Sequence, residues 1–262
     1  MSDLQTELVQ HACDVRGVHT ICLNHPEAFN VLSSQVMQAV QRCLDLINED
    51  AHARVVIVRG TGKAFCAGHD LREMRANPSF DYYQALFHQC SHMMMSLQRL
   101  SVPVIAVVDG IATAAGCQLV AMCDLAVAST ASKFAVSGVN LGLFCATPSV
   151  ALSRNLHRKA AFEMLVTGDF INADQALNKG LINAVVSSDG LNAEVERYVS
   201  SILAKPRTAI EIGKKLFYQQ LEQPLEAAYL NAENAMACNM MDAAALEGVQ
   251  AFIEKRRPSW KK

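Results

Sequence analysis

Two segments of the chain show the same order of elements: an apolar strand, a loop of small residues and a helix. The first segment runs from Val55 to Met74, and the second runs from Val104 to Cys123. Strands that alternate with helices in this way predict parallel crossover connections, with ligands bound beyond the carboxyl ends of the strands. The sequence therefore predicts an α/β fold.

The flanking segments add further elements. The stretch "ACDVRGVHTICLN" predicts two short strands around Gly17. A helix is expected over residues 33–50, capped by Ser33 or Ser34. Its apolar stripe consists of Val36, Met37, Val40, Leu44 and Ile47. Residues 61–70 are expected to form a loop, and the segment after Asp109 is expected to turn directly into a helix.

The second half of the chain is mainly helical, apart from the strand "LINAVVS". The shift toward helix near residue 200 predicts a core of residues 1–200 and a C-terminal helical region of residues 201–262. Met236, Met240, Met241 and Leu246 in that region fit either a core or a subunit contact.

Composition bears on the compartment and on partners. A formal net charge of -2 over 262 residues gives no general attraction to nucleic acid or to anionic membranes. No apolar run approaches the ~18 residues of a membrane span, and "MSDLQTELVQ" lacks the pattern of a signal or transit peptide. The nine cysteines are scattered without a C-x-x-C pair, as expected for reduced thiols. These features predict a cytoplasmic protein that binds neither nucleic acid nor membranes.

The two small-residue loops each lead into the N-terminus of a helix, where backbone N–H groups have no partner inside the helix. One donor from each loop, aimed at a single point, would stabilise an oxyanion such as the enolate of a thioester. Each loop taken alone also fits tight packing of a helix against a strand, so that alternative stays open.

Together the loops resemble a known family. "GKAFCAGHDL", followed by "PVIAVVDGIATAAGCQLVAMCDLAVAS", is similar to the crotonase, or enoyl-CoA hydratase/isomerase, superfamily. The resemblance spans nearly the whole chain. It implies a crotonase fold of repeated ββα units with a C-terminal helical trimerisation region. It also implies an acyl-CoA thioester ligand, a homo-oligomer (a trimer or a dimer of trimers), and no cofactor beyond the coenzyme A of the substrate.

The resemblance also assigns roles to residues. It places the oxyanion donors on the backbone N–H groups of His69 and Ala115. Coenzyme A and substrate would be bound by Lys63, Ala64, Phe65, Cys66, Ala67, Gly68, Arg72, Gly116, Asn140 and Cys145. Phe252 and Lys255 would reach the coenzyme A of a neighbouring subunit, although a solvated basic tail explains Lys255 equally well.

The sequence departs from the family at its acids. The two glutamates of the hydratases match Gln118 and Gly138, and the aspartate of the dienoyl-CoA isomerases matches Ala146. An amide such as Gln118 can hold a water but is not a general base near neutral pH. Because a positioned acid or base contributes about 10²–10⁴-fold, ordinary hydration is expected to be impaired.

Other side chains offer weaker substitutes. The imidazole of His69 has a suitable unperturbed pKa for proton transfer, but we expect it to point toward its loop. Asp70 is expected to cap the helix that follows it. Cys145 fits a buried thiol better than a nucleophile.

Three further motifs are incomplete. His88 and His92 are four residues apart, yet no third ligand is evident and no metal site is expected. The glycines of "SGVNLG" do not match the dinucleotide-binding spacing, and no serine lies in a G-x-S-x-G motif.

Two hypotheses about function remain. The first is an enzyme of the hydratase/isomerase type with an altered reaction. The second is an acyl-CoA-binding paralogue with weak catalysis and a binding or regulatory role.

Overall fold

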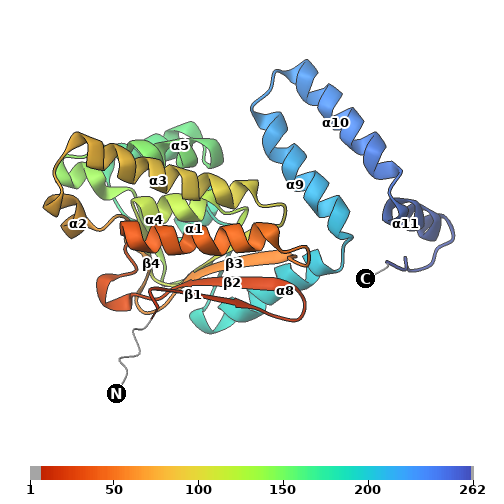
Figure 1. The fold of residues 1–262 in the computed structure, drawn as a ribbon, viewed down its shortest axis with the longest axis horizontal. Helices are drawn as coiled ribbons and strands as arrows, with labels where there is room; N and C mark the ends of the chain where they lie inside the picture. Colours follow the sequence, from red (N-terminus) through yellow and green to blue (C-terminus); the bar gives the residue numbers. More distant parts are fainter. Residues whose placement is uncertain (1–6, 261–262) are drawn as a thin grey trace.

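The computed structural model describes residues 7–260, which form a sheet-and-helix core followed by a helical C-terminal arm (Figure 1). The strands are β1 (Val9–Cys13), β2 (Val18–Leu23), β3 (Val55–Gly60), β4 (Ala64–Cys66), β5 (Val104–Val108), β6 (Ile111–Thr113), β7 (Leu125–Ser129), β8 (Lys133–Ala135), β9 (Ile171–Asn172) and β10 (Ala184–Val186). The helices are α1 (Ser34–Glu49), α2 (Leu71–Ala76), α3 (Phe80–Arg99), α4 (Ala115–Met122), α5 (Ala146–Asn155), α6 (Arg158–Thr167), α7 (Ala173–Lys179), α8 (Leu191–Leu203), α9 (Arg207–Leu221), α10 (Leu225–Met240) and α11 (Ala243–Ile253). Short 3-10 helices are η1 (Pro26–Ala28), η2 (Ser137–Leu141) and η3 (Ser188–Gly190).

The larger sheet has the strand order β1-β2-β3-β5-β7-β10. β1 and β2 are antiparallel, as expected for two strands around Gly17, and every other neighbouring pair is parallel. α1 contacts β1 and β2 on one face, and α8 contacts β5 and β7 on the other. The predicted parallel crossovers are therefore confirmed, and covered strands explain their continuous apolar sequence.

The predicted apolar stripe of α1 is buried along its whole length, from Val36 to Ile47. Ser33 caps the helix, and its hydroxyl accepts a hydrogen bond from the N–H of Val36. Asp70 caps α2 in the same way, through the N–H groups of Arg72 and Glu73. The expected role of Asp70 as a helix cap is confirmed.

A second, four-stranded sheet, β4-β6-β8-β9, corrects two local predictions. The expected loop of residues 61–70 contains β4, and the expected turn after Asp109 contains β6. The two strands pair in parallel. Three-residue strands are too short to show the two-residue periodicity that identifies a strand. With them, each of the two segments becomes a ββα unit, which is the arrangement that the resemblance implied.

The C-terminal helices α9, α10 and α11 project beside the core (Figure 1). The predicted domain boundary at residue 200 falls inside α8, which packs on the larger sheet through Leu191, Val195 and Val199. The division into domains therefore stays a prediction. Within residues 7–260, no helix combines the length and apolar character needed to cross a bilayer.

Candidate active site

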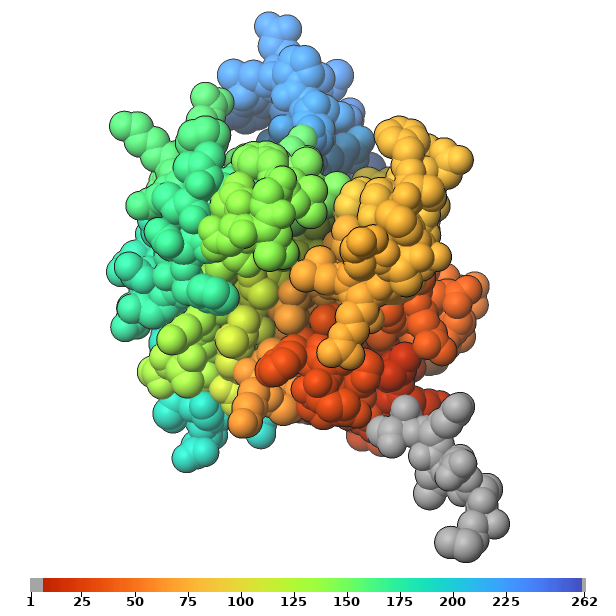
Figure 2. Space-filling model, turned by 90° about the vertical axis from the view of Figure 1, so that its left-hand side faces the viewer, coloured from red at the N-terminus to blue at the C-terminus, as the bar shows by residue number. Residues whose placement is uncertain are grey.

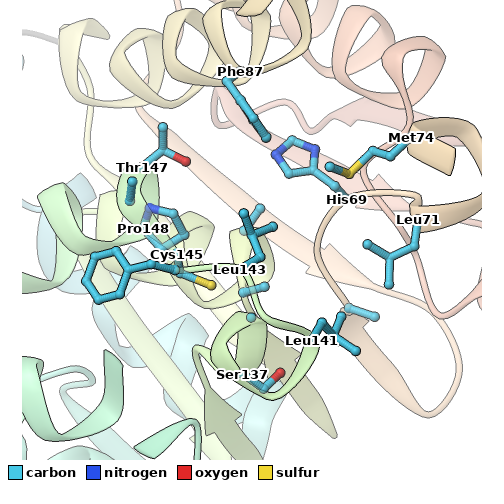
Figure 3. Close-up of a pocket in the computed structure, with 16 residues that line it drawn as sticks. His69, Leu71, Met74, Phe87, Ser137, Leu141, Leu143, Cys145, Thr147 and Pro148 are labelled. Atoms are coloured by element: carbon cyan, nitrogen blue, oxygen red, sulfur yellow. The ribbon is translucent and has the colours of Figure 1, made fainter. Parts of the chain in front are cut away.

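A cavity of about 240 Å³ opens between α2 and the segment that joins η2 to α5. Figure 2 shows the surface hollowed between these two segments, and Figure 3 shows the side chains around the cavity. The lining residues are Ala67, His69, Leu71, Met74, Phe87, Ala114, Ala115, Ser137, Gly138, Leu141, Leu143, Phe144, Cys145, Ala146, Thr147 and Pro148. None of them is an Asp or a Glu. The described part of the chain thus builds an apolar pocket without a carboxylate.

The first loop presents the backbone of His69 to this cavity. Gly68 has a φ of 90°, a conformation that glycine adopts readily, and its carbonyl accepts a hydrogen bond of 2.7 Å from the N–H of Leu32. This bond forms the bridge between Leu32 and His69 without using the N–H of His69. Among residues 7–260, no acceptor is bonded to that N–H.

The second loop presents the backbone of Ala115, the first residue of α4. Ala114 has a φ of 50° and a ψ of -119°, an unfavourable backbone conformation for a residue with a side chain. The N–H of Ala114 donates a hydrogen bond of 2.9 Å to the carbonyl of Ala135, which holds this turn in place. The N–H of Ala115 lies at the helix start, where no carbonyl of α4 can accept it, and no other described residue does.

The two loops are in contact. A Cβ added to Gly68 would lie 3.2 Å from the nitrogen of Ala115, and one added to Gly116 would lie only 2.0 Å from the carbonyl oxygen of Cys66. Residues 68 and 116 therefore need glycine because the two backbones approach so closely. The tight packing of helix against strand, which the sequence left open as an alternative, is therefore present. It occurs together with the amides of His69 and Ala115, which have no acceptor among the described residues.

The side chain of His69 also faces the cavity, contrary to the expectation that it points toward its own loop (Figure 3). Its Nδ1 lies 3.3 Å from the carbonyl oxygen of Leu32, so we assign the proton to Nδ1. The other ring nitrogen, Nε2, is buried with no hydrogen-bond partner in the described residues. Burial lowers the pKa of His69, although the Leu32 bond and the charge of Glu73 oppose this effect. His69 is thus a neutral imidazole with an unused acceptor nitrogen.

Gln118, which matches the first glutamate of the hydratases, lies inside α4 and is 4% exposed. Its Oε1 is buried without a hydrogen-bond partner in the described residues. Gln118 does not belong to the cavity lining.

Gly138, which matches the second glutamate, lines the cavity within η2. A Cβ at this position would lie 2.5 Å from the carbonyl oxygen of Leu143 and 2.6 Å from the Sγ of Cys145. The loop is closed by a hydrogen bond of 3.0 Å from the N–H of Leu143 to the carbonyl of Gly138. The space for a glutamate is therefore filled, so the acid is absent and its place is also blocked.

Cys145 lines the cavity at the start of α5. Burial raises the pKa of its thiol, opposed by a hydrogen bond from the backbone of Gly138. No described basic side chain is hydrogen-bonded to its Sγ. A protonated thiol without a base fits the interpretation of Cys145 as a packing residue.

The remaining residues predicted to bind coenzyme A lie in different environments. The side chains of Ala64, Phe65 and Cys66 are buried in the core, so a ligand could reach only their backbone. Of residues 63–68, only Ala67 lines the cavity, while Lys63 and Arg72 are exposed. Their roles toward coenzyme A stay predictions.

Three predicted residues lie away from the cavity lining. Asn140 donates a hydrogen bond of 3.4 Å from its Nδ2 to the carbonyl of Gly168. Phe252 lies in α11 and Lys255 just beyond it, in the arm beside the core (Figure 1). The geometry therefore does not place Phe252 and Lys255 at the cavity of their own chain.

The sequence reasoning missed most of the apolar wall. The wall includes Leu71, Met74 and Phe87 from α2 and α3, and Leu141 and Leu143 from the segment between η2 and α5 (Figure 3). Phe144 of that segment lines the cavity as well. The segment "LGLF" carries one signal of this wall, because it brings three large apolar residues together around Gly142. In the structure all three are at least 47% exposed.

Known structures show the same fold. The chain is 58% identical to an enoyl-CoA hydratase of Mycobacterium smegmatis, with a TM-score of 0.96 and coverage of 97% of this chain and 99% of that one. It is 41% identical to human enoyl-CoA hydratase domain-containing protein 3, with a TM-score of 0.93 and coverage of 97% and 100%. The segment "GLFCATPSVALSR", residues 142–154, predicts that the chain resembles this branch of the superfamily, and the comparison confirms that prediction.

A curated relative corrects the predicted location. The rat protein named enoyl-CoA hydratase domain-containing protein 3, mitochondrial, is 44% identical over 93% of this chain and 81% of its own length. The zebrafish and human relatives carry the same mitochondrial name. The prediction of a cytoplasmic protein is thereby contradicted. The prediction depended on the first ten residues, of which residues 1–6 lie outside the described part. A targeting signal is recognised by a receptor and does not affect how the fold packs.

The family model described as enoyl-CoA hydratase/isomerase matches residues 14–262. Together with the ββα units and the relatives above, this match shows that the chain belongs to the enoyl-CoA hydratase/isomerase family of the crotonase superfamily.

Proposed function

We propose that this protein binds an acyl-CoA thioester and polarises its carbonyl through the N–H groups of His69 and Ala115. One observation carries the proposal: two backbone amides from two different loops border one apolar cavity, and neither has an acceptor within residues 7–260. Unpaired buried amides are rare in proteins, which supports a ligand oxygen as their partner. The acyl chain would lie against the apolar wall defined above.

The proposed reaction is of the hydratase or isomerase type, with ordinary hydration impaired. Two donors at a developing oxyanion stabilise an enolate, and removing one such donor costs about 10²–10³-fold in rate. Hydration also needs groups that deliver and remove protons. Gln118 and Gly138 supply none, and the cavity wall holds no carboxylate. The expected rate on an enoyl-CoA is therefore several orders of magnitude below that of a relative with both glutamates.

His69 is the one cavity residue suited to proton transfer at neutral pH. Its Nε2 has a free lone pair and no competing partner among the described residues. If the protein turns over an acyl-CoA, we propose that this nitrogen accepts the proton that the family's glutamates would accept. The lowered pKa keeps it in the basic form at neutral pH.

The second candidate function is a binding protein for acyl-CoA. The blocked position of Gly138 favours it, because the loop of residues 138–145 fills the space of a catalytic acid. In that case the amides hold the thioester without a chemical step. We propose no cofactor other than the coenzyme A of the ligand.

We further propose that the chain acts as a homo-oligomer. Large apolar side chains on α9, α10 and α11 are exposed, including Phe217, Leu225, Tyr229, Met236 and Phe252. Exposed apolar surface of this extent is typical of protein interfaces. In an oligomer, Phe252 and Lys255 could reach the coenzyme A of a neighbouring subunit, as the resemblance implies.

Binding to the two amides can be tested with a pair of ligands. An acyl-CoA and the alkyl thioether of coenzyme A with the same chain length differ only by the carbonyl oxygen. Two hydrogen bonds are worth about 1–3 kcal/mol in total, so the thioester should bind about tenfold or more tightly by calorimetry. Equal affinities would overturn the proposed oxyanion site.

Turnover separates the two candidate functions. The measurement is the loss of enoyl-thioester absorbance over several chain lengths, with Gln118→Glu as a nearly isosteric restoration of one acid. Gly138→Glu is unsuitable because its Cβ would collide with Leu143 and Cys145. Fast hydration by the natural protein would contradict the proposal that hydration is impaired because Gln118 and Gly138 stand in place of the two glutamates. Retained binding without turnover on hydratase, isomerase or thioesterase substrates would favour the binding protein.

A further inference from the structure

A second group of reactive side chains lies outside the cavity, where β1, β2 and the end of α1 meet. Cys13 and His19 are direct cross-strand partners in the antiparallel pair. Opposed residues in such a pair point to the same face of the sheet. His11 lies two residues before Cys13 and shares that face. α1 covers this face of the sheet, and Asp50 is the C-terminal cap of α1. The carboxylate of Asp50 therefore lies close to Cys13 and His19.

The ligand atoms of three of these residues converge. The Nε2 of His19 lies 3.0 Å from Oδ2 of Asp50 and 3.5 Å from Sγ of Cys13. All three atoms lie within 4.8 Å of one another. In tetrahedral zinc sites, metal–ligand distances of about 2.0–2.3 Å place neighbouring ligand atoms about 3.3–3.7 Å apart. The two distances from His19 are therefore close to the spacing that a bound zinc ion requires.

Two outer hydrogen bonds hold these ligands in orientation. His11 places its Nε2 3.0 Å from Nδ1 of His19, the ring nitrogen that faces away from the other ligands. The backbone N–H of His52 donates to Oδ1 of Asp50 at 2.7 Å, which leaves Oδ2 available. Metal-binding histidines and carboxylates characteristically have such outer partners.

Burial and charge also fit a metal. His19 is 4% exposed and fixed, whereas Cys13 and His11 are exposed and leave a path for an ion. A thiolate and a carboxylate together neutralise a divalent cation. Sulfur, imidazole and carboxylate form a ligand set suited to zinc. This group differs from the pair His88 and His92, whose spacing in the sequence suggested no site.

We propose that Cys13, His19 and Asp50 bind a zinc ion, with His11 as the hydrogen-bond acceptor that orients His19. Without metal, His19 donates its Nε2 proton to Asp50 and accepts from His11. On binding, the Nε2 lone pair of His19 coordinates zinc and the His19 proton moves to Nδ1, from which it is donated to Nε2 of His11. The proton that His11 carried on Nε2 moves to its own Nδ1, and Cys13 releases its thiol proton to solvent. A fourth position is left for water. The site does not depend on the proposed acyl-CoA function.

Cobalt(II) and zinc(II) titrations of the full chain, stripped with a chelator, test this site. Cobalt should bind once per chain with a thiolate-to-cobalt charge-transfer band, and zinc should displace it. Cys13→Ser should abolish that band. Cys238→Ser is the matched control, because Cys13 and Cys238 are the two exposed cysteines of the described chain. His11→Ala should keep the band and weaken zinc binding about 10–100-fold.

Folding of the variants is checked by circular dichroism, and Asp50→Asn provides an independent ligand variant should Cys13→Ser behave abnormally. Zinc should raise the melting temperature of the natural chain and of Cys238→Ser, and should not raise that of Cys13→Ser or Asp50→Asn. A band that survives Cys13→Ser would overturn the proposal. So would the absence of any binding below millimolar metal, which would make the group a His–Asp hydrogen-bond network only.

Discussion

Buried polar groups are treated in opposite ways in two regions of this molecule. Nε2 of His69, at the cavity, and Oε1 of Gln118, in α4 outside the cavity lining, are both buried without partners in the described residues. Where α9 meets the core, Nζ of Lys214 donates to the carbonyls of Leu97 and Val102 and to Oδ2 of Asp124, at 2.7–3.0 Å.

The carboxylate of Asp124 is satisfied just as completely. It accepts hydrogen bonds from the N–H of Val104 at 2.6 Å and from the hydroxyl of Tyr218 at 2.7 Å. Burial lowers the pKa of Lys214, and the charge of Asp124 opposes that effect. We call Asp124, Lys214 and Tyr218 the α9 anchor.

The difference separates stability from function. A buried polar group left unpaired lowers the free energy of unfolding by about 1–3 kcal/mol. We propose that the unpaired Nε2 of His69 is kept because a ligand in the cavity supplies its missing partner. The α9 anchor instead fixes the C-terminal arm in one position on the core. Each of the following variants tests this division.

The largest effect is expected from Asp124→Ala in the α9 anchor. The substitution leaves the hydroxyl of Tyr218 and the N–H of Val104 without their acceptor, and it leaves the buried ammonium of Lys214 without its counter-charge. Breaking a buried pair in this way costs about 3–5 kcal/mol. Urea unfolding followed by circular dichroism measures this loss. The affinity for acyl-CoA per folded molecule should stay within twofold. A loss of affinity without loss of stability would erase the distinction between the regions.

Gly116→Ala should have the next largest effect, and it acts on both properties. Its Cβ would lie 2.0 Å from a backbone oxygen, so the start of α4 must move. Overpacking of this kind costs about 1–3 kcal/mol, and the displaced N–H of Ala115 should weaken acyl-CoA binding.

The control for Gly116→Ala is Gly213→Ala in α9, where an added Cβ meets nothing within 4 Å. Alanine should raise the free energy of unfolding there by up to about 1 kcal/mol. Equal behaviour of the two variants in urea unfolding would show that the close approach of the loops is not what requires glycine.

Gln118→Leu is expected to stabilise the protein modestly, in contrast to the α9 anchor. It removes a buried acceptor without a partner, and the gain should be about 1 kcal/mol. Gln89→Leu is a matched control because the amide of Gln89 donates to the carbonyl of Ser34 at 2.9 Å. The control should lose about 0.5–1.5 kcal/mol in the same urea experiment. Destabilisation by Gln118→Leu would mean that its amide is paired after all.

The sequence predicted those features that depend on local pattern. The stripe of α1 and the order of strands and helices show the periodicity of their elements. The assignment of His69 and Ala115 came instead from the resemblance of the two small-residue loops to the family, and their role stays a prediction. The sequence could not predict that Leu143 and Cys145 fill the space beside Gly138, because that depends on how a loop closes. The group around His19 was hidden for a similar reason: its members converge only through the register of β1 and β2 and the length of α1.

The smallest expected effect is a dependence of stability on pH that His69 causes. Burial lowers its pKa in the folded state below the unfolded value of about 6.5, so the unfolded chain binds the proton more readily. The contribution of the neutral imidazole is complete above pH 6.5 and is lost as the pH falls through and below that value. In urea unfolding at pH 7.5 and 5.5, the natural chain should lose more free energy of unfolding than His69→Gln, which has no titrating ring. Bound acyl-CoA should deepen this loss if it covers Nε2. An equal loss in both proteins would mean that the ring is hydrated in the folded state, and His69 would then belong with the satisfied groups of the α9 anchor rather than with the cavity.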